Sequence, residues 1–193
     1  MTLPNILNIL RTDKTVFTFK ELMLFLGLTD AVLLRRRISY YVKTGDFYPL
    51  RRGIYAKNKD YNKLELAVKI CTPSYISFET VLTEAGVIFQ YYNQIFVASY
   101  LTREIICDKQ LFSYKKIKDL TLTNNFGIEN KNNYAIATKE RAFLDIIYLN
   151  KNYHFDNLSP LDWDKVFTGL PIYANKNMIK LVNNYYKEFK ASL

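Results

Sequence analysis

The chain has 193 residues, of which 49% are hydrophobic and 23% are charged, and it carries a formal net charge of +9. This composition predicts a globular protein with a substantial apolar core and excludes an extensively disordered chain, and the few glycines and prolines exclude collagen-like and low-complexity sequences. No leader peptide opens the sequence and no run approaches the roughly 18 apolar residues of a membrane span, so we expect a cytoplasmic protein with no membrane partner.

The amino-terminal part of the chain has the pattern of three helices. Apolar residues at helical spacing predict a helix over about residues 3–12, and Thr18 with Glu21 has the pattern of a capping box that begins a second helix. Thr29 is predicted to cap a third helix, which Gly45 ends. Two helices joined by so short a glycine-containing turn are typical of a helix-turn-helix.

The third helix is predicted to have one apolar and one polar face. At 100° per residue its apolar side chains fall in one sector, which we expect to pack on the first two helices. A far face of cations and hydroxyls suits a DNA major groove, where Arg reads guanine edges and hydroxyls reach phosphates; a solvated amphipathic helix is the alternative. The far face carries Thr29, Val32, Arg36, Ser39, Tyr40 and Lys43, with Arg35 and Arg37 on its flanks.

A hairpin is predicted directly after this helix. Two short β-type runs, 47–50 and 54–56, are joined by a basic turn at Arg52 and Gly53. In a winged helix-turn-helix such a hairpin is the wing, and Arg51 and Arg52 would enter the minor groove or hold phosphates. The alternative is a hairpin that only covers the hydrophobic core. This alternative accounts for the apolar residues of the hairpin but not for the two arginines.

The excess positive charge is concentrated in this part of the chain. Residues 1–57 hold ten Lys or Arg and four Asp or Glu, a net charge of +6, whereas the remaining 136 residues have a net charge of +3. A polyanion is therefore attracted most strongly to the amino-terminal part. Nucleic acid fits better than a membrane surface, because the basic residues do not share a helix with a bulky exposed apolar face.

Residues 58–60 are the predicted boundary between a domain over residues 1–57 and a second over residues 58–193. The second domain is predicted to contain helices and an antiparallel sheet, which makes the whole chain an α+β protein. Ser77 is predicted to cap one of its helices, and the Asn-rich residues 124–133 are predicted to form a surface loop. Helices are expected at about 64–70, 77–85, 138–148, 160–168 and 175–190, and strands at 88–90, 94–100, 104–107, 111–114 and 134–137.

Three segments together resemble a known family. Leu50–Tyr55, Pro73–Leu82 and Ala137–Tyr148, in this order and at these distances behind the helix-turn-helix, resemble the AbiEi antitoxins of type IV toxin-antitoxin systems, which act in abortive phage infection. The resemblance implies an amino-terminal winged helix-turn-helix that binds inverted repeats in promoter DNA and represses its own operon. It also implies a carboxy-terminal antitoxin domain that counters a nucleotidyltransferase toxin.

The resemblance also implies which residues contact DNA and which match the carboxy-terminal motifs, and some of the latter are interpreted from their place in the sequence. Ser77 is interpreted as a helix cap, and Glu140 and Asp145 are interpreted as structural hydrogen-bonding groups, because five residues of separation place them on different faces of one helix. The implied DNA-contacting residues are Arg35, Arg36, Ser39, Tyr40, Lys43, Arg51 and Arg52, and the residues that match the carboxy-terminal motifs are Tyr75, Ser77, Glu140 and Asp145.

The sequence does not favour an enzyme, a metal or a cofactor. His154 is the only histidine and is predicted to be a surface or partly buried loop residue. Cys71 and Cys107 have no metal-ligand spacing, and no glycine-rich phosphate loop occurs. Glu129 and Lys131, with Asp119 upstream, resemble a metal-dependent nuclease site, but their predicted loop lacks the rigid strand that such a site needs. A stand-alone DNA- or RNA-binding regulator and the nuclease remain the alternatives to the antitoxin.

Overall fold

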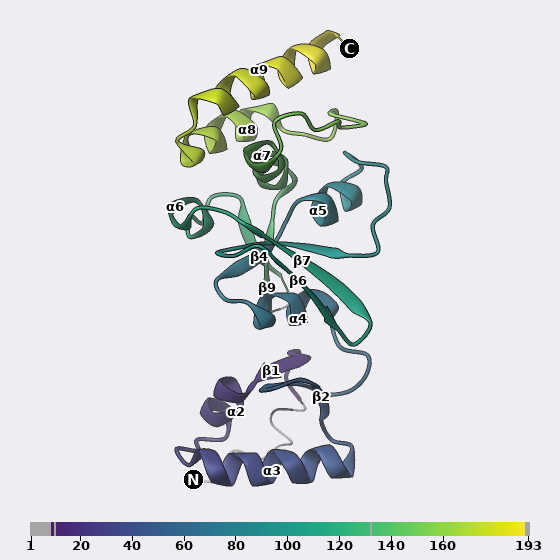
Figure 1. Ribbon diagram of the computed structural model, residues 1–193, viewed down its shortest axis with the longest axis vertical. Helices are drawn as coiled ribbons and strands as arrows, with labels where there is room; N and C mark the ends of the chain where they lie inside the picture. Colours follow the sequence, from purple (N-terminus) through teal and green to yellow (C-terminus); the bar gives the residue numbers. More distant parts are fainter. Residues whose placement is uncertain (1–8, 10, 132, 192–193) are drawn as a thin grey trace.

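The computed structural model describes residues 9, 11–131 and 133–191 and shows a mixed α+β protein (Figure 1). A three-stranded sheet has the strand order β1-β3-β2, and a six-stranded sheet has the order β6-β7-β5-β4-β9-β8. The molecule is elongated, with α3 across one end and α9 across the other (Figure 1). The helix predicted at 3–12 lies outside the described residues, apart from three of its positions. No helix among the described residues has the length and apolar character needed to cross a membrane.

Among its described residues, the amino-terminal part contains the helices α2 and α3 and the small sheet. The Thr18 side chain accepts a hydrogen bond from the Glu21 N–H and the Glu21 carboxylate accepts one from the Thr18 N–H, so the predicted capping box is confirmed. A small apolar cluster that includes Ile9, Leu34 and Ile38 joins the helices to the sheet. The elements are β1 (Val16–Thr18), α2 (Phe19–Phe25), α3 (Ala31–Thr44), β2 (Tyr48–Arg51) and β3 (Ile54–Ala56).

The ends of α3 are set by local chemistry. The Asp30 carboxylate accepts hydrogen bonds from the N–H groups of Val32 and Leu33, at 2.7 and 3.2 Å, so Asp30 is the N-cap and the prediction of Thr29 was wrong by one residue. Both residue types cap helices well, and the one whose oxygen reaches two free N–H groups takes the position. Gly45 ends the helix in the left-handed conformation, with φ of 83°, as predicted.

The small sheet of the amino-terminal part packs directly on the rest of the chain. Val16, Ile54 and Ala56 of the small sheet belong to the large apolar cluster that continues through α4 and the six-stranded sheet. The buried carboxylate of Glu65 in α4 (Lys63–Ile70) accepts hydrogen bonds from the N–H and hydroxyl of Thr15, at 2.9 and 2.7 Å. The predicted boundary at 58–60 is exposed, and an apolar core continues beneath it.

The six-stranded sheet is mixed. The sequence pattern predicted an antiparallel sheet, but β4 pairs parallel with β9 and β5 pairs parallel with β7. The strands β6 and β7, which are joined by a short turn, are antiparallel as expected. The parallel pairs join strands that are not consecutive in the chain, since β6 lies between β5 and β7 and several elements lie between β4 and β9. The strands are β4 (Ser74–Ile76), β5 (Ile95–Ser99), β6 (Arg103–Cys107), β7 (Gln110–Lys116), β8 (Ile128–Lys131) and β9 (Tyr134–Ala137).

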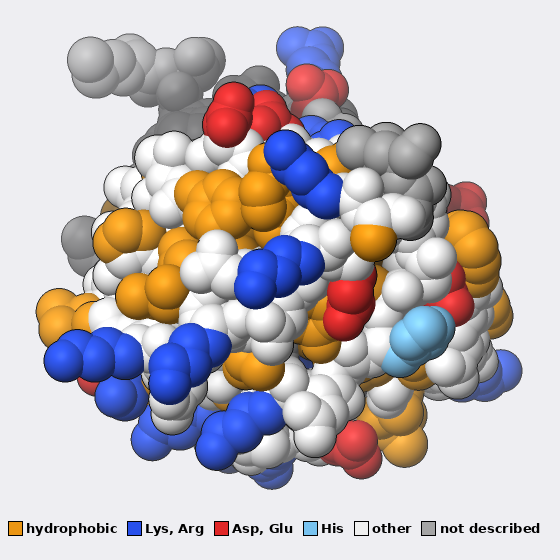
Figure 2. All heavy atoms as spheres, turned by 90° about the horizontal axis from the view of Figure 1, so that it is seen from above, with side chains coloured by type: hydrophobic (Ala, Val, Ile, Leu, Met, Phe, Trp, Pro, Cys, Tyr) orange, Lys and Arg blue, Asp and Glu red, His pale blue; other side chains and the backbone are white. Residues whose placement is uncertain are grey.

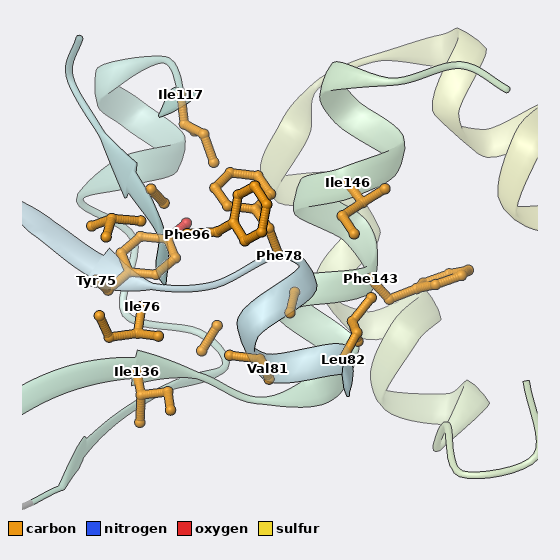
Figure 3. Packing of buried hydrophobic residues seen from close by; sticks show 14 of the residues in the cluster. Tyr75, Ile76, Phe78, Val81, Leu82, Phe96, Ile117, Ile136, Phe143 and Ile146 are labelled. Carbon is orange, nitrogen blue, oxygen red and sulfur yellow. The ribbon is translucent and has the colours of Figure 1, made fainter. Parts of the chain in front are cut away.

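Helices cover both faces of this sheet. The helix α4 lies between the six-stranded sheet and the amino-terminal part, whereas α5 and α7 lie on the opposite face (Figure 1). Phe78, Leu82, Phe143 and Ile146 fill the space between α5, α7 and the strands (Figure 3). The remaining elements are α5 (Glu79–Glu84), α6 (Asp119–Leu122), α7 (Lys139–Leu149), α8 (Trp163–Gly169), the 3₁₀-helix η1 (Leu170–Tyr173) and α9 (Lys176–Ala191).

Three local predictions in this part were wrong. Ser77 does not cap a helix, because its hydroxyl donates to Asp145 at 2.7 Å and α5 begins at Glu79. Residues 88–90 form no strand, because the Phe89 N–H donates to the Asp156 carboxylate instead of to a neighbouring strand. Within the Asn-rich segment, residues 128–131 form β8 at the edge of the sheet, where polar side chains face water without cost.

A buried ion pair holds the strands to α7. Arg141 and Asp145 are fully buried, with 3.3 Å between Nε and the carboxylate. Asp145 also accepts hydrogen bonds from the hydroxyls of Tyr75, Ser77 and Tyr173, and the Arg141 guanidinium lies over both tyrosine rings. The structural hydrogen-bonding role expected for Asp145 is confirmed.

Candidate nucleic-acid interface

The packing of the inner face of α3 determines which of its side chains are exposed on the outer face. Leu34 and Ile38 are buried against α2 and the small sheet, which fixes the rotation of the helix about its axis. The opposite face points away from the rest of the molecule, at the end of the long axis (Figure 1). The residues named from the sequence that are exposed on α3 are Val32, Arg35, Arg36, Ser39, Tyr40 and Lys43, whereas Arg37 is half-buried. Thr29 is also exposed but precedes the N-cap of the helix.

The hairpin turn is held next to α3 through Phe19. The Phe19 N–H, at the start of α2, donates to the Gly53 carbonyl at 2.8 Å. The Arg35 guanidinium lies over the Phe19 ring, 5.8 Å from its centroid, so an α3 cation and the turn share one neighbour. Gly53 has φ of 77°, a conformation that glycine adopts without strain. The turn that carries Arg52 therefore lies close to Arg35 of α3.

Arg51 and Arg52 are both exposed but face different surroundings. Arg52 lies in the turn itself. Arg51 ends β2 beside the six-stranded sheet, close to the thiols of Cys71 and Cys107. Burial raises the pKa of both thiols, and the nearby positive charge of Arg51 offsets part of this rise. The Cys107 thiol donates to the Leu50 carbonyl at 3.3 Å. Arg52 is thus better placed than Arg51 to act together with α3.

The cations of this surface are not neutralised by carboxylates. Among the ion pairs between described residues, none involves the arginines or the lysine of α3 or the two hairpin arginines. Lys20, the exposed residue that follows Phe19 in α2, adds a cation next to the turn. Lys20 was not predicted from the sequence to belong to the interface, although it is one of the ten Lys or Arg of residues 1–57. A surface of uncompensated positive charge attracts a polyanion.

The residues of the nuclease alternative are brought together only in part. Glu129 and Lys131 lie on the strand β8, so the loop predicted for them was wrong, and their side chains form an exposed ion pair at 3.6 Å. Asp119 begins α6. Within the part of the chain that the structure describes, no three His, Cys, Asp or Glu side chains form a group that could hold a metal ion. The His154 side chain is 89% exposed, so its predicted surface position is confirmed.

Comparisons with known proteins do not extend this description. A scan against models of protein families gives no match, and no curated protein matches the chain.

Proposed function

We propose that residues 1–57 form a winged helix-turn-helix that binds double-stranded DNA. In this proposal α3 is the recognition helix in the major groove, and the β2–β3 hairpin is the wing. Arg36, Ser39 and Lys43 reach base edges and phosphates, and Arg52 and Lys20, which lie near one another at the hairpin turn, hold the DNA backbone. The observation that carries the proposal is the row of exposed, unpaired cations on α3 next to the basic hairpin turn.

DNA binding is tested with the duplex upstream of the protein's own reading frame. Arg36→Ala is expected to weaken specific binding by about 1–3 kcal/mol, the contribution of one bidentate base contact. Lys180→Ala, which removes one positive charge from an exposed position on α9, is the matched control and should bind as the wild type does. Wild-type affinity in Arg36→Ala, measured by fluorescence anisotropy against competitor DNA, would remove α3 from the interface.

We further propose that the full chain is an antitoxin of the AbiEi type that represses its own operon and counters a nucleotidyltransferase toxin. This part of the proposal rests on the resemblance of the Leu50–Tyr55, Pro73–Leu82 and Ala137–Tyr148 segments to that family. The test is growth after co-expression with a nucleotidyltransferase encoded next to the protein. Rescue of growth that persists in Arg36→Ala would separate the antitoxin activity from DNA binding. Absence of rescue by the wild-type protein would contradict the proposed antitoxin function.

A further inference from the structure

The end of the molecule opposite α3 carries an apolar pocket. A cavity of about 390 Å³ opens between α8, η1 and the first turn of α9. Figure 2 looks down on this end, where apolar side chains gather among Lys or Arg side chains. Leu170 is buried in the pocket, and Ile179 on its rim is 49% exposed. The lining residues are Phe167, Leu170, Pro171, Ala174, Asn175, Lys176 and Ile179.

A stripe of lysines runs along α9 from the rim of this pocket. Lys176, Lys180, Lys187 and Lys190 are all exposed, and at 100° per residue they fall within about 80° around the helix. The stripe is about 21 Å long at 1.5 Å per residue. Glu188, the only acidic residue of α9, lies outside the stripe. The ion pairs between described residues include none of these four lysines, although Lys190 lies over the Tyr186 ring.

We propose that this pocket and the lysine stripe together form a docking site for an acidic amphipathic helix of a protein partner. Such a helix places an apolar side chain in the pocket and aligns carboxylates with the lysines, which is the common mode of helix recognition in a groove. The unpaired lysines select negative charge and so set the chemistry of the partner.

The lining of the pocket favours an apolar side chain over a nucleic-acid base. Only Asn175 and Lys176 carry polar side chains among the lining residues. A base inserted there would leave most of its hydrogen-bonding edge without a partner, at a cost that an aliphatic side chain does not incur. This inference is independent of DNA binding by α3, because the two surfaces lie at opposite ends of the molecule (Figure 1).

The probe for this site is a synthetic amphipathic helical peptide with leucines on one face and glutamates on the other. Its fluorescein-labelled form is titrated with the full-length protein, next to a peptide in which lysines replace the glutamates. We expect saturable binding of the acidic peptide only. Ile179→Asp should weaken this binding at least about tenfold by placing a charge on the pocket rim. Lys180→Glu with Lys187→Glu should also weaken it and reduce its salt dependence.

Leu120→Asp is the matched control, because Leu120 is 88% exposed on α6, outside the pocket. It should bind the acidic peptide as the wild type does, and far-UV circular dichroism checks that each variant is folded. The proposal is overturned by absent binding of the acidic peptide, by equal binding of the lysine peptide, or by wild-type affinity in Ile179→Asp. A single-stranded RNA that binds in place of the acidic peptide and is lost in Ile179→Asp would assign the site to nucleic acid instead.

Discussion

Replacing Asp145 by Asn is expected to destabilise the protein severely. The Asp145 carboxylate is fully buried and accepts hydrogen bonds from Tyr173 at 2.6 Å, Ser77 at 2.7 Å, Tyr75 at 3.0 Å and Arg141 at 3.3 Å. The asparagine keeps the shape of the side chain but removes its charge. The Arg141 guanidinium then stays buried with only neutral acceptors.

The expected loss follows from these contacts. Breaking a buried ion pair by removing one partner costs about 3–5 kcal/mol, because the other charge is left uncompensated. The amide oxygen of asparagine still accepts part of the hydrogen bonds, which places Asp145→Asn near the lower end, at about 3 kcal/mol. That is a large fraction of the 5–15 kcal/mol by which domains are typically stable.

Urea unfolding, followed by circular dichroism and by the fluorescence of the single tryptophan, Trp163, measures this loss. Glu104→Gln is the control, because it removes one negative charge from an exposed position on β6 and should change the unfolding free energy by no more than about 0.5 kcal/mol. A loss below about 1 kcal/mol in Asp145→Asn, with an unchanged denaturant slope, would refute the role given to the buried pair.

Two further changes test other contacts of the fold. Burial raises the pKa of Glu21, but hydrogen bonds from Lys14 and Lys69 outweigh this effect and lower the pKa from 4.5 to about 2. The stabilisation from the ionised Glu21 is therefore present above about pH 4.5 and lost as the pH falls towards 2. In Glu21→Gln this loss of about 1–2 kcal/mol of unfolding free energy between pH 4.5 and 2 should be absent, which melting temperatures measured against pH would show. Gly127→Ala should cost about 1–3 kcal/mol in urea unfolding, since φ is 67° and the new Cβ would lie 2.8 Å from the Arg141 Cβ; an unchanged midpoint would show that the backbone relaxes.

Features of the fold that depend on local chemistry were predictable from the sequence. The capping box at Thr18, the end of α3 at Gly45 and the hairpin turn at Gly53 all arise from residues within a few positions of each other. The rotation of α3, and with it the exposure of Arg36 and Lys43, follows from the apolar stripe of the same helix. The helix and hairpin that carry the candidate interface are therefore the part of the structure that was most predictable from the sequence.

Features that depend on distant partners were missed. Ser77 resembles a helix cap, but Asp145, 68 residues away, takes its hydroxyl. The strand β8 has a polar sequence and forms because its backbone pairs antiparallel with β9. The surroundings of Arg51 depend on the packing of the hairpin on the six-stranded sheet, which no pattern within residues 1–57 reveals.

The salt dependence of duplex binding tests the central claim most directly. Each phosphate contact contributes about 0.9 to the slope of log affinity against log salt, so the double variant Lys43→Ala, Arg52→Ala should have a slope shallower by up to about 2. The double variant Lys176→Ala, Lys180→Ala removes the same charge from the opposite end and should keep the wild-type slope. Equal slopes for both variants, or no salt-dependent binding by the wild type, would contradict the assignment of α3 and the hairpin as the DNA-binding surface.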